Sequence, residues 1–277
     1  MSTVENREEV GMSSVACSRD RVLCAATTGW IIWFVAMVII AMGAGSLSTW
    51  IALDSVARSG SAVVLNAVVP VADGELVRVA STAPGWVLPQ PIAAQHGHAH
   101  FTTPAPQQAG IHSWSALPSQ EEEVDFSAGS LAVLEADQPW VGISIDGILA
   151  DAPWQKIQTP NPPRPYPSAH GGMLDLSRHA LLVCWCSIDV EQLPSLRQWW
   201  SRFGLPSAIL LIQDSDGEAF DHARQQLGDP ILCLAGVAAI SSLPALEIEV
   251  IGVGTGNGAG WETAIQRIEQ LQQKGNR

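Results

Sequence analysis

The chain has 277 residues, enough for one or two domains with a buried core, and its composition is 47% hydrophobic and only 15% charged. Its formal net charge is −13 at pH 7, and Lys156 and Lys274 are its only lysines. Such a chain repels nucleic acid phosphates, so we exclude nucleic acid as a partner.

The first strong pattern along the chain is an uncharged segment over residues 22–53. Its apolar stretch exceeds the roughly 20 residues that a helix needs to cross a bilayer. Trp30, Trp33 and Trp50 lie near its ends, where indole prefers the membrane interface. A cleaved signal peptide and a buried helix are the alternatives, but the long polar segment before it is atypical of a signal peptide. Residues 22–53 therefore predict a transmembrane anchor in contact with the lipid bilayer.

The arginines flanking this segment predict its orientation. Arg7, Arg19 and Arg21 precede it, whereas the next arginines, Arg58 and Arg78, follow at a greater distance. The positive-inside rule then predicts that residues 1–21 are a cytoplasmic tail. We expect a single-pass protein of the bacterial inner membrane, with its C-terminal domain in the periplasm.

Residues 54–158 predict a small β-rich segment that contains a linker rich in Pro, His and Gln. β-branched runs over 62–88, with a turn at "ADGE", are typical of a β-hairpin. Residues 89–126 have the composition of the linker, and residues 130–150 are again β-rich. Residues 159–173 are too proline-rich for the interior of an element and indicate a boundary.

Three histidines of this linker are weak candidates for metal ligands. His96, His98 and His100 alternate along the chain, so an extended segment would place them on one face, where imidazoles suit Cu²⁺, Zn²⁺ or Ni²⁺. A linker provides no ordered groups to orient the rings. The sequence therefore favours an incidental histidine run, and we expect no metal and no other cofactor.

From residue 174 to residue 277, short apolar strands alternate with amphipathic helices. Leu193, Leu196, Trp200 and Phe203 have the spacing of one helix face packed on a sheet. Alternation of this kind is typical of a three-layer α/β domain with a mainly parallel sheet.

The stretch "LLVCWCSIDVEQLP" at 181–194 resembles the thioredoxin-like domains of membrane-anchored periplasmic proteins of the cytochrome c maturation type. The matching residues are Trp185, Cys186, Leu193 and Pro194, where that family has Trp-Cys-x-x-Cys followed by Leu-Pro at the start of a helix. "ISSLPALEIEV" at 240–250 is similar to the family's cis-proline segment, with Pro244 as that proline. The resemblance covers only residues 174–277. It implies a thioredoxin-like fold in which Cys186 is the nucleophilic thiol and Pro244 lies beside it.

The sequence departs from that family at one position that matters for chemistry. The second cysteine of the motif falls on Asp189, so the family's resolving thiol is missing. A helix N-terminus would lower the pKa of Cys186, whereas Asp189 would oppose that effect. Cys184 is either a partner for a disulfide with Cys186 or a small buried hydrophobic residue.

Two other motifs carry little weight. "GVGTGNGAG" at 252–260 is similar to a phosphate-binding loop but lacks the Lys-Ser/Thr of a P-loop. "SIDGILAD" at 144–151 superficially resembles the Asp-x-Asp-Gly motif of haloacid-dehalogenase phosphatases. It has Ser144 where the nucleophile would stand, so a turn at Asp146–Gly147 explains it better.

These patterns predict a single transmembrane helix, a small β-rich segment and an α/β thioredoxin-like domain. The expected function is that of a non-catalytic assembly or scaffold factor for a membrane or periplasmic protein client. The alternative is a thiol-disulfide accessory protein that uses Cys186 as a single nucleophilic thiol.

Overall fold

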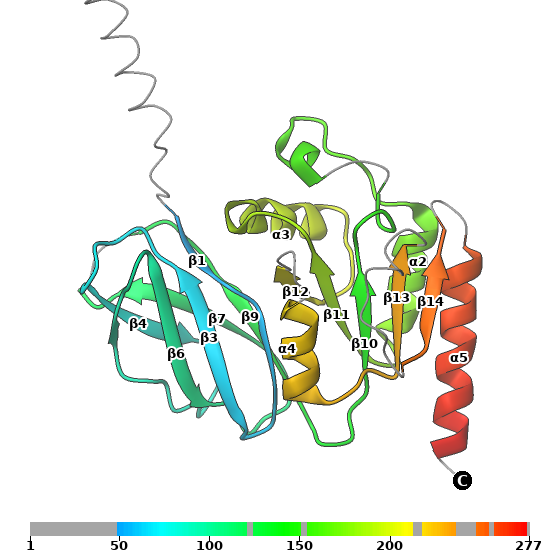
Figure 1. The fold of residues 1–277 in the computed structure, drawn as a ribbon, viewed down its shortest axis with the longest axis horizontal. Coiled ribbons are helices and arrows are strands. Elements are labelled where there is room, and N and C mark those ends of the chain that lie inside the picture. The colour runs from blue at the N-terminus through cyan, green and yellow to red at the C-terminus, as the bar shows by residue number, and fades with distance from the viewer. Residues whose placement is uncertain are drawn as a thin grey trace, which may run out of the picture. The chain divides into compact units, whose positions relative to one another are not determined.

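The fold is taken from a computed structural model, which describes residues 49–120, 124–150, 154–212, 218–236, 248–254 and 258–275 (Figure 1). Residues 49–134 form a β-sandwich and residues 140–275 form an α/β half, and both belong to one compact unit.

The sandwich consists of two β-sheets. The first has the order β6-β3-β1-β8, with β1 at Trp50–Ala52, β3 at Ala62–Val68, β6 at His98–Pro104 and β8 at Phe126–Ser127. The second has the order β2-β9-β7-β4-β5, with β2 at Ser55–Arg58, β4 at Leu76–Ser81, β5 at Ile92–Ala93, β7 at Gly110–Pro118 and β9 at Gly129–Leu134. The β1–β8 and β2–β9 pairs are parallel and the other pairs are antiparallel.

Alternation of side chains decides which residues fill the sandwich core. In β6, exposed and buried residues alternate strictly, so His98 and His100 point outward while Ala99 and Phe101 point inward. Phe101 packs in one cluster with tryptophans and aliphatic residues from both sheets, among them Trp50, Val63, Trp114 and Leu131. The chain passes from the first sheet to the second between β1 and β2, at Leu53–Asp54.

The α/β half is built on a sheet of five strands that are all parallel. Their order is β12-β11-β10-β13-β14, with β10 at Trp140–Ser144, β11 at Leu181–Cys186, β12 at Ile209–Ile212, β13 at Leu232–Gly236 and β14 at Val250–Val253. The first strand in the chain is central, and successive strands are added on one side and then on the other. This is a doubly wound arrangement.

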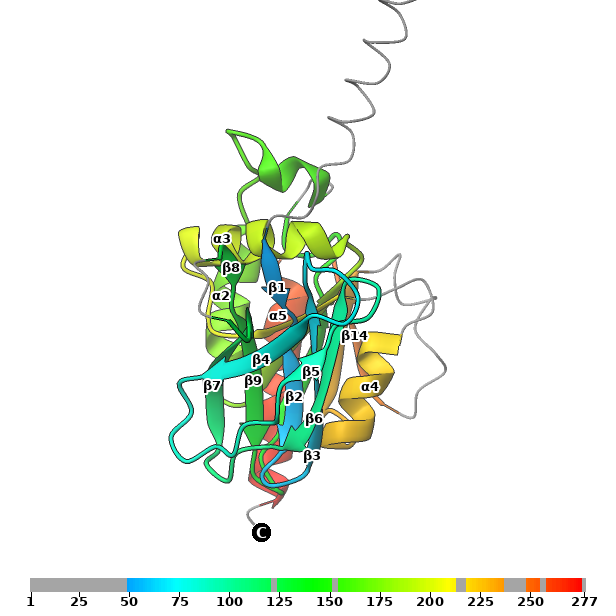
Figure 2. The ribbon, with the colours of Figure 1, turned by 90° about the vertical axis from the view of Figure 1, so that its left-hand side faces the viewer.

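Different elements pack on the two faces of this sheet. Helices α2 (Pro167–Leu176), α3 (Leu193–Arg202) and α5 (Ala259–Gly275) share a buried cluster with Cys184 and Cys186. On the opposite face, α4 (Glu218–Leu227) packs against Trp185 together with residues of β2 and β9 of the sandwich. Figure 2 shows α4 on the side away from α2. Short 3-10 helices occupy Trp154–Gln158 (η1) and Val190–Gln192 (η2).

Gly142 makes room for the indole of Trp185 against the sheet. A Cβ atom at Gly142 would come within 2.9 Å of Cζ3 of Trp185 and 3.0 Å of Sγ of Cys233. The indole therefore fits against the central strand and contacts Phe220 of α4, with ring centroids 4.7 Å apart. Edge-tilted aromatic pairs at this distance add to the stability gained by burial.

The predicted thioredoxin-like fold of residues 174–277 is wrong. The central strand of the sheet, β10, lies at Trp140–Ser144, outside the region of resemblance, and β11 and β13 pair with it on either side. Residues 174–277 alone would lack the strand that joins the two halves of their sheet. The prediction failed because alternating strands and helices are common to all three-layer α/β folds.

The predicted transmembrane helix over residues 22–53 is also corrected. Among the described residues, no helix is both long enough and apolar enough to cross a membrane. Trp50, Ile51 and Ala52, at the end of that segment, form β1 and are at most 3% exposed, so their apolar character reflects burial in the protein. Residues 22–48 lie outside the described part of the chain. The predicted single-pass, inner-membrane and periplasmic placement is contradicted with it.

Residues 54–158, expected to be a β-rich segment with a linker, contribute to both halves of the molecule. The expected linker, residues 89–126, carries β5, β6, β7 and the first residue of β8. The expected boundary, residues 159–173, includes the first turns of α2, in which Pro167 stands at the start. Proline is well tolerated there, because the first N–H groups of a helix have no partner within it.

Candidate functional site: an acidic cleft beside the parallel sheet

Cys186 is the last residue of β11 and is only 1% exposed. Its side chain packs with Cys184 under α2 and α3, and both are free thiols. Burial raises the pKa of Cys186, and the nearby carboxylate of Asp146 raises it further. These effects disfavour the thiolate, which is the reactive form of cysteine.

Cys186 also lies away from the helix that was expected to activate it. Residues Ser187–Asp189 separate it from η2, and α3 begins only at Leu193. The backbone N–H of Asp189 donates to Oε1 of Gln192 at 3.3 Å, which closes the turn into η2. Pro244 falls in residues 237–247, outside the described part of the chain. The nucleophilic role of Cys186 thus stays a prediction, and its burial counts against it.

The carboxyl ends of β10 and β11 are tied together at Asp146. Its Oδ2 accepts a hydrogen bond from the backbone N–H of Ser187 at 3.1 Å, and the N–H of Ile145 donates to the carbonyl of Trp185 at 3.0 Å. Asp146 and Gly147 lie in a turn with Gly147 at φ 74°, so the predicted turn is confirmed. Ser144, in the position of the phosphatase nucleophile, is the buried last residue of β10.

A cleft of about 850 Å³ opens where the carboxyl ends of β11 and β12 meet the sandwich. From the α/β half, the cleft is lined by Ser187–Val190 and Gln192, which follow β11, and by Leu210–Ile212 of β12. Helix α4 adds Glu218, Ala219 and His222. The sandwich contributes Leu53, Asp54 and Ser55, together with Val64 and Asn66 of β3. Ligands of parallel sheets bind at the carboxyl ends of strands. Here the cleft lies toward the edge strand β12, not at the switch point between β10 and β13.

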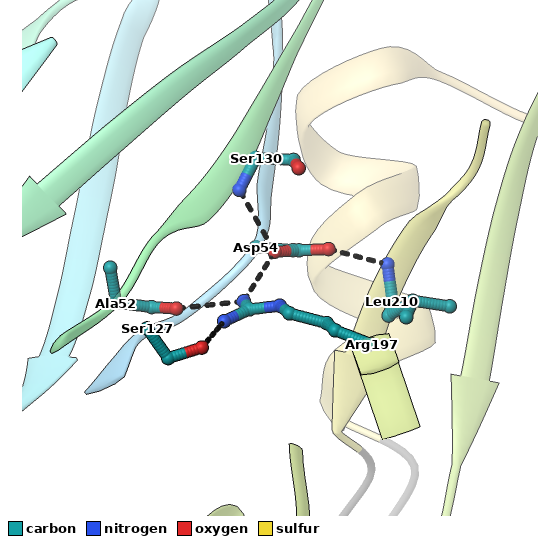
Figure 3. A network of polar contacts seen from close by, with 6 residues as sticks. All are labelled: Ala52, Asp54, Ser127, Ser130, Arg197 and Leu210. Atoms are coloured by element: carbon teal, nitrogen blue, oxygen red, sulfur yellow. Dashed lines mark hydrogen bonds and ion pairs between the residues drawn. The ribbon is translucent and has the colours of Figure 1, made fainter. Parts of the chain in front are cut away.

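Asp54 and Arg197 hold the two walls of this cleft together (Figure 3). Oδ1 of Asp54 lies 2.5 Å from Nη2 of Arg197 and accepts the N–H of Ser130 at 2.9 Å. Oδ2 accepts the N–H of Leu210, in edge strand β12, at 2.8 Å. Arg197 also donates to the carbonyl of Ala52 at 2.7 Å and to Oγ of Ser127 at 2.9 Å. One carboxylate and one guanidinium therefore join β1, β8, β9, β12 and α3.

The cleft has a mixed lining, in which apolar side chains alternate with polar ones and the charged groups are acidic. Asp189 and Glu218 are exposed, and none of the described lining residues is Lys or Arg. Burial lowers the pKa of His222, so its imidazole is neutral at pH 7. Ser187, Gln192 and Asn66 add neutral hydrogen-bonding groups. The surface fits a ligand that is cationic or donates hydrogen bonds, and it disfavours an anion.

The structure places the three histidines in two different environments. His96 has φ 51° in the turn before β6, where its backbone N–H donates to Oδ1 of Asp73 at 2.5 Å. His98 and His100 are on the exposed face of β6, with nearly parallel rings 5.9 Å apart. Within the described ranges, no group of three or more His, Cys, Asp or Glu side chains is placed to hold a metal ion.

Comparisons with known proteins identify no family. No protein-family model matches the chain, and no curated protein matches it. A sialyltransferase from Photobacterium damsela is similar over 70% of this chain and 38% of its own, with 12% sequence identity and a TM-score of 0.22. This chain thus spans well under half of that protein's length. A likeness at that TM-score carries no argument about fold or function.

Sequence reasoning missed the residues that build the cleft. Asp54 directly follows the predicted membrane segment and was not considered as a site residue. Arg197 lies in a predicted helix of which only the apolar face was interpreted. The signal that was available is chemical: a charged residue directly after an apolar strand needs a partner if it is buried. The partner's position, 143 residues away, follows only from the fold.

Proposed function

We propose that this chain is a non-catalytic binding protein whose cleft takes up a small polar molecule bearing a cationic amine. The observation that carries the proposal is the cleft itself, about 850 Å³ in volume with Asp189 and Glu218 on its surface and no cation among its described lining residues. Pockets for small molecules typically measure roughly 300–1,000 Å³.

The rigidity of the walls supports binding. Asp54 is 8% exposed and accepts hydrogen bonds from the sandwich and from β12 at once, so the opposing walls are fixed before a ligand arrives. A preformed site avoids the entropy cost of ordering its walls on binding. The neutral state of His222 removes a charge that would repel an amine.

The burial of the thiols counts against thiol catalysis. Burial raises the pKa of Cys186, and Cys186 is not among the residues that line the cleft. A thiol-disulfide reaction needs an accessible thiolate and a resolving thiol. Cys186 therefore has no thiol-disulfide role in the proposed function.

The scaffold role expected from the sequence requires a surface for a protein client. The large exposed apolar side chains in the described residues are Leu76, Val87, Ile111, Phe126 and Leu174. They are spread over β4, β7, β8, α2 and a loop, which gives no continuous patch of the kind that marks protein interfaces. The cleft is for this reason the better-supported binding site.

The test is calorimetric titration of the full chain with three four-carbon probes: 1,4-diaminobutane, butane-1,4-diol and succinate. We expect the diamine to bind most tightly and succinate not at all. Asp189→Asn and Glu218→Gln should each weaken diamine binding by about two- to fivefold, as for exposed ion pairs, and leave diol binding unchanged. Equal binding of diamine and succinate, or diamine binding indifferent to both variants, would contradict the proposal.

A further inference from the structure

We propose that His98 and His100 form a two-imidazole binding site for a divalent transition metal ion, with Cu²⁺ bound most tightly. Both side chains are exposed on the same face of β6, because residues two apart in a strand point the same way. Their ring centroids are 5.9 Å apart and their planes differ by 8°. The site shares one residue with the cleft, because Asn66, which lines the cleft, also contacts His100.

The hydrogen bond of His100 leaves its outer nitrogen ready to bind a metal. Nδ1 of His100 lies 2.8 Å from Oδ1 of Asn66 on β3. An amide oxygen only accepts hydrogen bonds, so Nδ1 carries the proton and Nε2 of the neutral ring keeps its lone pair. Metal-binding histidines in proteins usually have such a partner on the other ring nitrogen, which fixes the tautomer and the ring orientation.

The pairing of β6 with β3 fixes the backbone positions of His98 and His100. β6 pairs with β3 in antiparallel register over seven residue pairs, in which His98 is opposite Val68 and His100 is opposite Asn66. The rings are now stacked face to face, so Nε2 atoms converge on one ion only after the exposed side chain of His98 turns. Exposed side chains change rotamer within nanoseconds, and the backbone need not move.

The donor set selects the class of metal. Two imidazoles suit Cu²⁺, Ni²⁺ and Zn²⁺, at metal–nitrogen distances of about 2.0–2.1 Å for zinc, and water completes the coordination. Among these ions, Cu²⁺ generally forms the most stable complexes. Hard ions such as Mg²⁺ prefer oxygen ligands and should not bind.

His96 provides a matched control. It is two residues before His98 and is also exposed, but it lies in the turn, where Asp73 accepts its backbone N–H and lies 3.4 Å from its Nδ1. His96→Ala therefore removes an exposed imidazole of the same run without touching the strand face.

The experiment is a titration of the full chain with Cu²⁺, in which calorimetry measures the affinity and electron paramagnetic resonance at one equivalent of Cu²⁺ identifies the coordinating nitrogens. We expect nitrogen couplings from two imidazoles, and at least about tenfold weaker binding in His98→Ala and in His100→Ala, each with one coupled nitrogen remaining. Asn66→Ala should weaken binding by about 10- to 100-fold, as loss of such a partner typically does, while two nitrogens stay coordinated. His96→Ala should bind as the parent chain does. Unchanged affinity in His98→Ala, or a loss in His96→Ala equal to that in His98→Ala, would overturn the proposal.

Discussion

Asp54, in the crossing between the two sheets of the sandwich, is paired with Arg197 of helix α3 at 2.5 Å, and both side chains are largely shielded from water. The side chain of Asp54 is 2% exposed and that of Arg197 is 17% exposed. This pair joins the sandwich to the α/β half and fixes the position of the cleft between them.

Breaking this pair should strongly destabilise the protein. Arg197→Met leaves the Asp54 carboxylate buried without its counter-charge, and we expect a loss of about 3–5 kcal/mol in the free energy of unfolding. Urea denaturation measures this loss. Arg178→Met is the control, because its pair with Asp175 is exposed and should be worth about 1 kcal/mol or less. The double variant Asp54→Leu/Arg197→Met should recover part of the loss, since no charge then remains buried. Equal effects of Arg197→Met and Arg178→Met would contradict this role.

The buried thiols should make the protein less stable in alkali. Burial raises the pKa of Cys186 and raises that of Cys233 to about 12. Unfolded cysteine titrates near pH 8.5, so above that pH the unfolded chain has lost protons that the folded chain keeps. Stability therefore falls as pH rises above about 8.5, by up to about 1.4 kcal/mol per pH unit for each thiol. In Cys186→Ala, the plot of unfolding free energy against pH over that range should be less steep. A slope identical to that of the parent chain would show that Cys186 has the same pKa in the folded and unfolded states, which would contradict this prediction.

Two adjacent glycines in α2 should respond to alanine in opposite directions. A Cβ atom at Gly172 would lie 2.6 Å from the indole of Trp261 in α5, whereas nothing lies within 4 Å of one at Gly171. Gly172→Ala should destabilise the protein by about 1–3 kcal/mol, because the core is overpacked. Gly171→Ala should stabilise it by about 0.5–1 kcal/mol, as alanine does in a helix interior. Thermal unfolding of both variants provides the comparison. A stabilising Gly172→Ala would mean that α2 and α5 are not in close contact.

The sequence predicted local structure better than it predicted topology. The hydrophobic run at 181–186 and the apolar face of residues 193–203 match β11 and α3, because periodicity depends on neighbours in the chain. The partners of each strand depend on residues far apart. β10 was placed in a separate segment since nothing local indicates that Trp140–Ser144 pairs with β11 and β13.

The misread segments share a physical cause. Trp50 and Ala52 are buried in the sandwich core and Ile51 in the core of the α/β half, and hydropathy alone does not distinguish such burial from burial in lipid. The Pro- and His-rich residues 98–104 form β6 because alternate residues, Ala99 and Phe101, fill the sandwich core. The cleft was beyond prediction because its lining comes from β3, the segments after β11, strand β12 and α4.

The central claim, that the cleft binds an amine-bearing molecule, is tested most directly by a two-dimensional ¹H–¹⁵N NMR titration of the full chain with 1,4-diaminobutane. We predict that the backbone amides of Ser187, Asp189 and Ile212 and the side-chain amide of Gln192 shift together along one saturating binding curve, because all four residues line the cleft. The amide signals of β4 and β5, two strands that do not line the cleft, should not shift. Saturating shifts confined to residues outside the cleft, or none at millimolar diamine, would contradict the account.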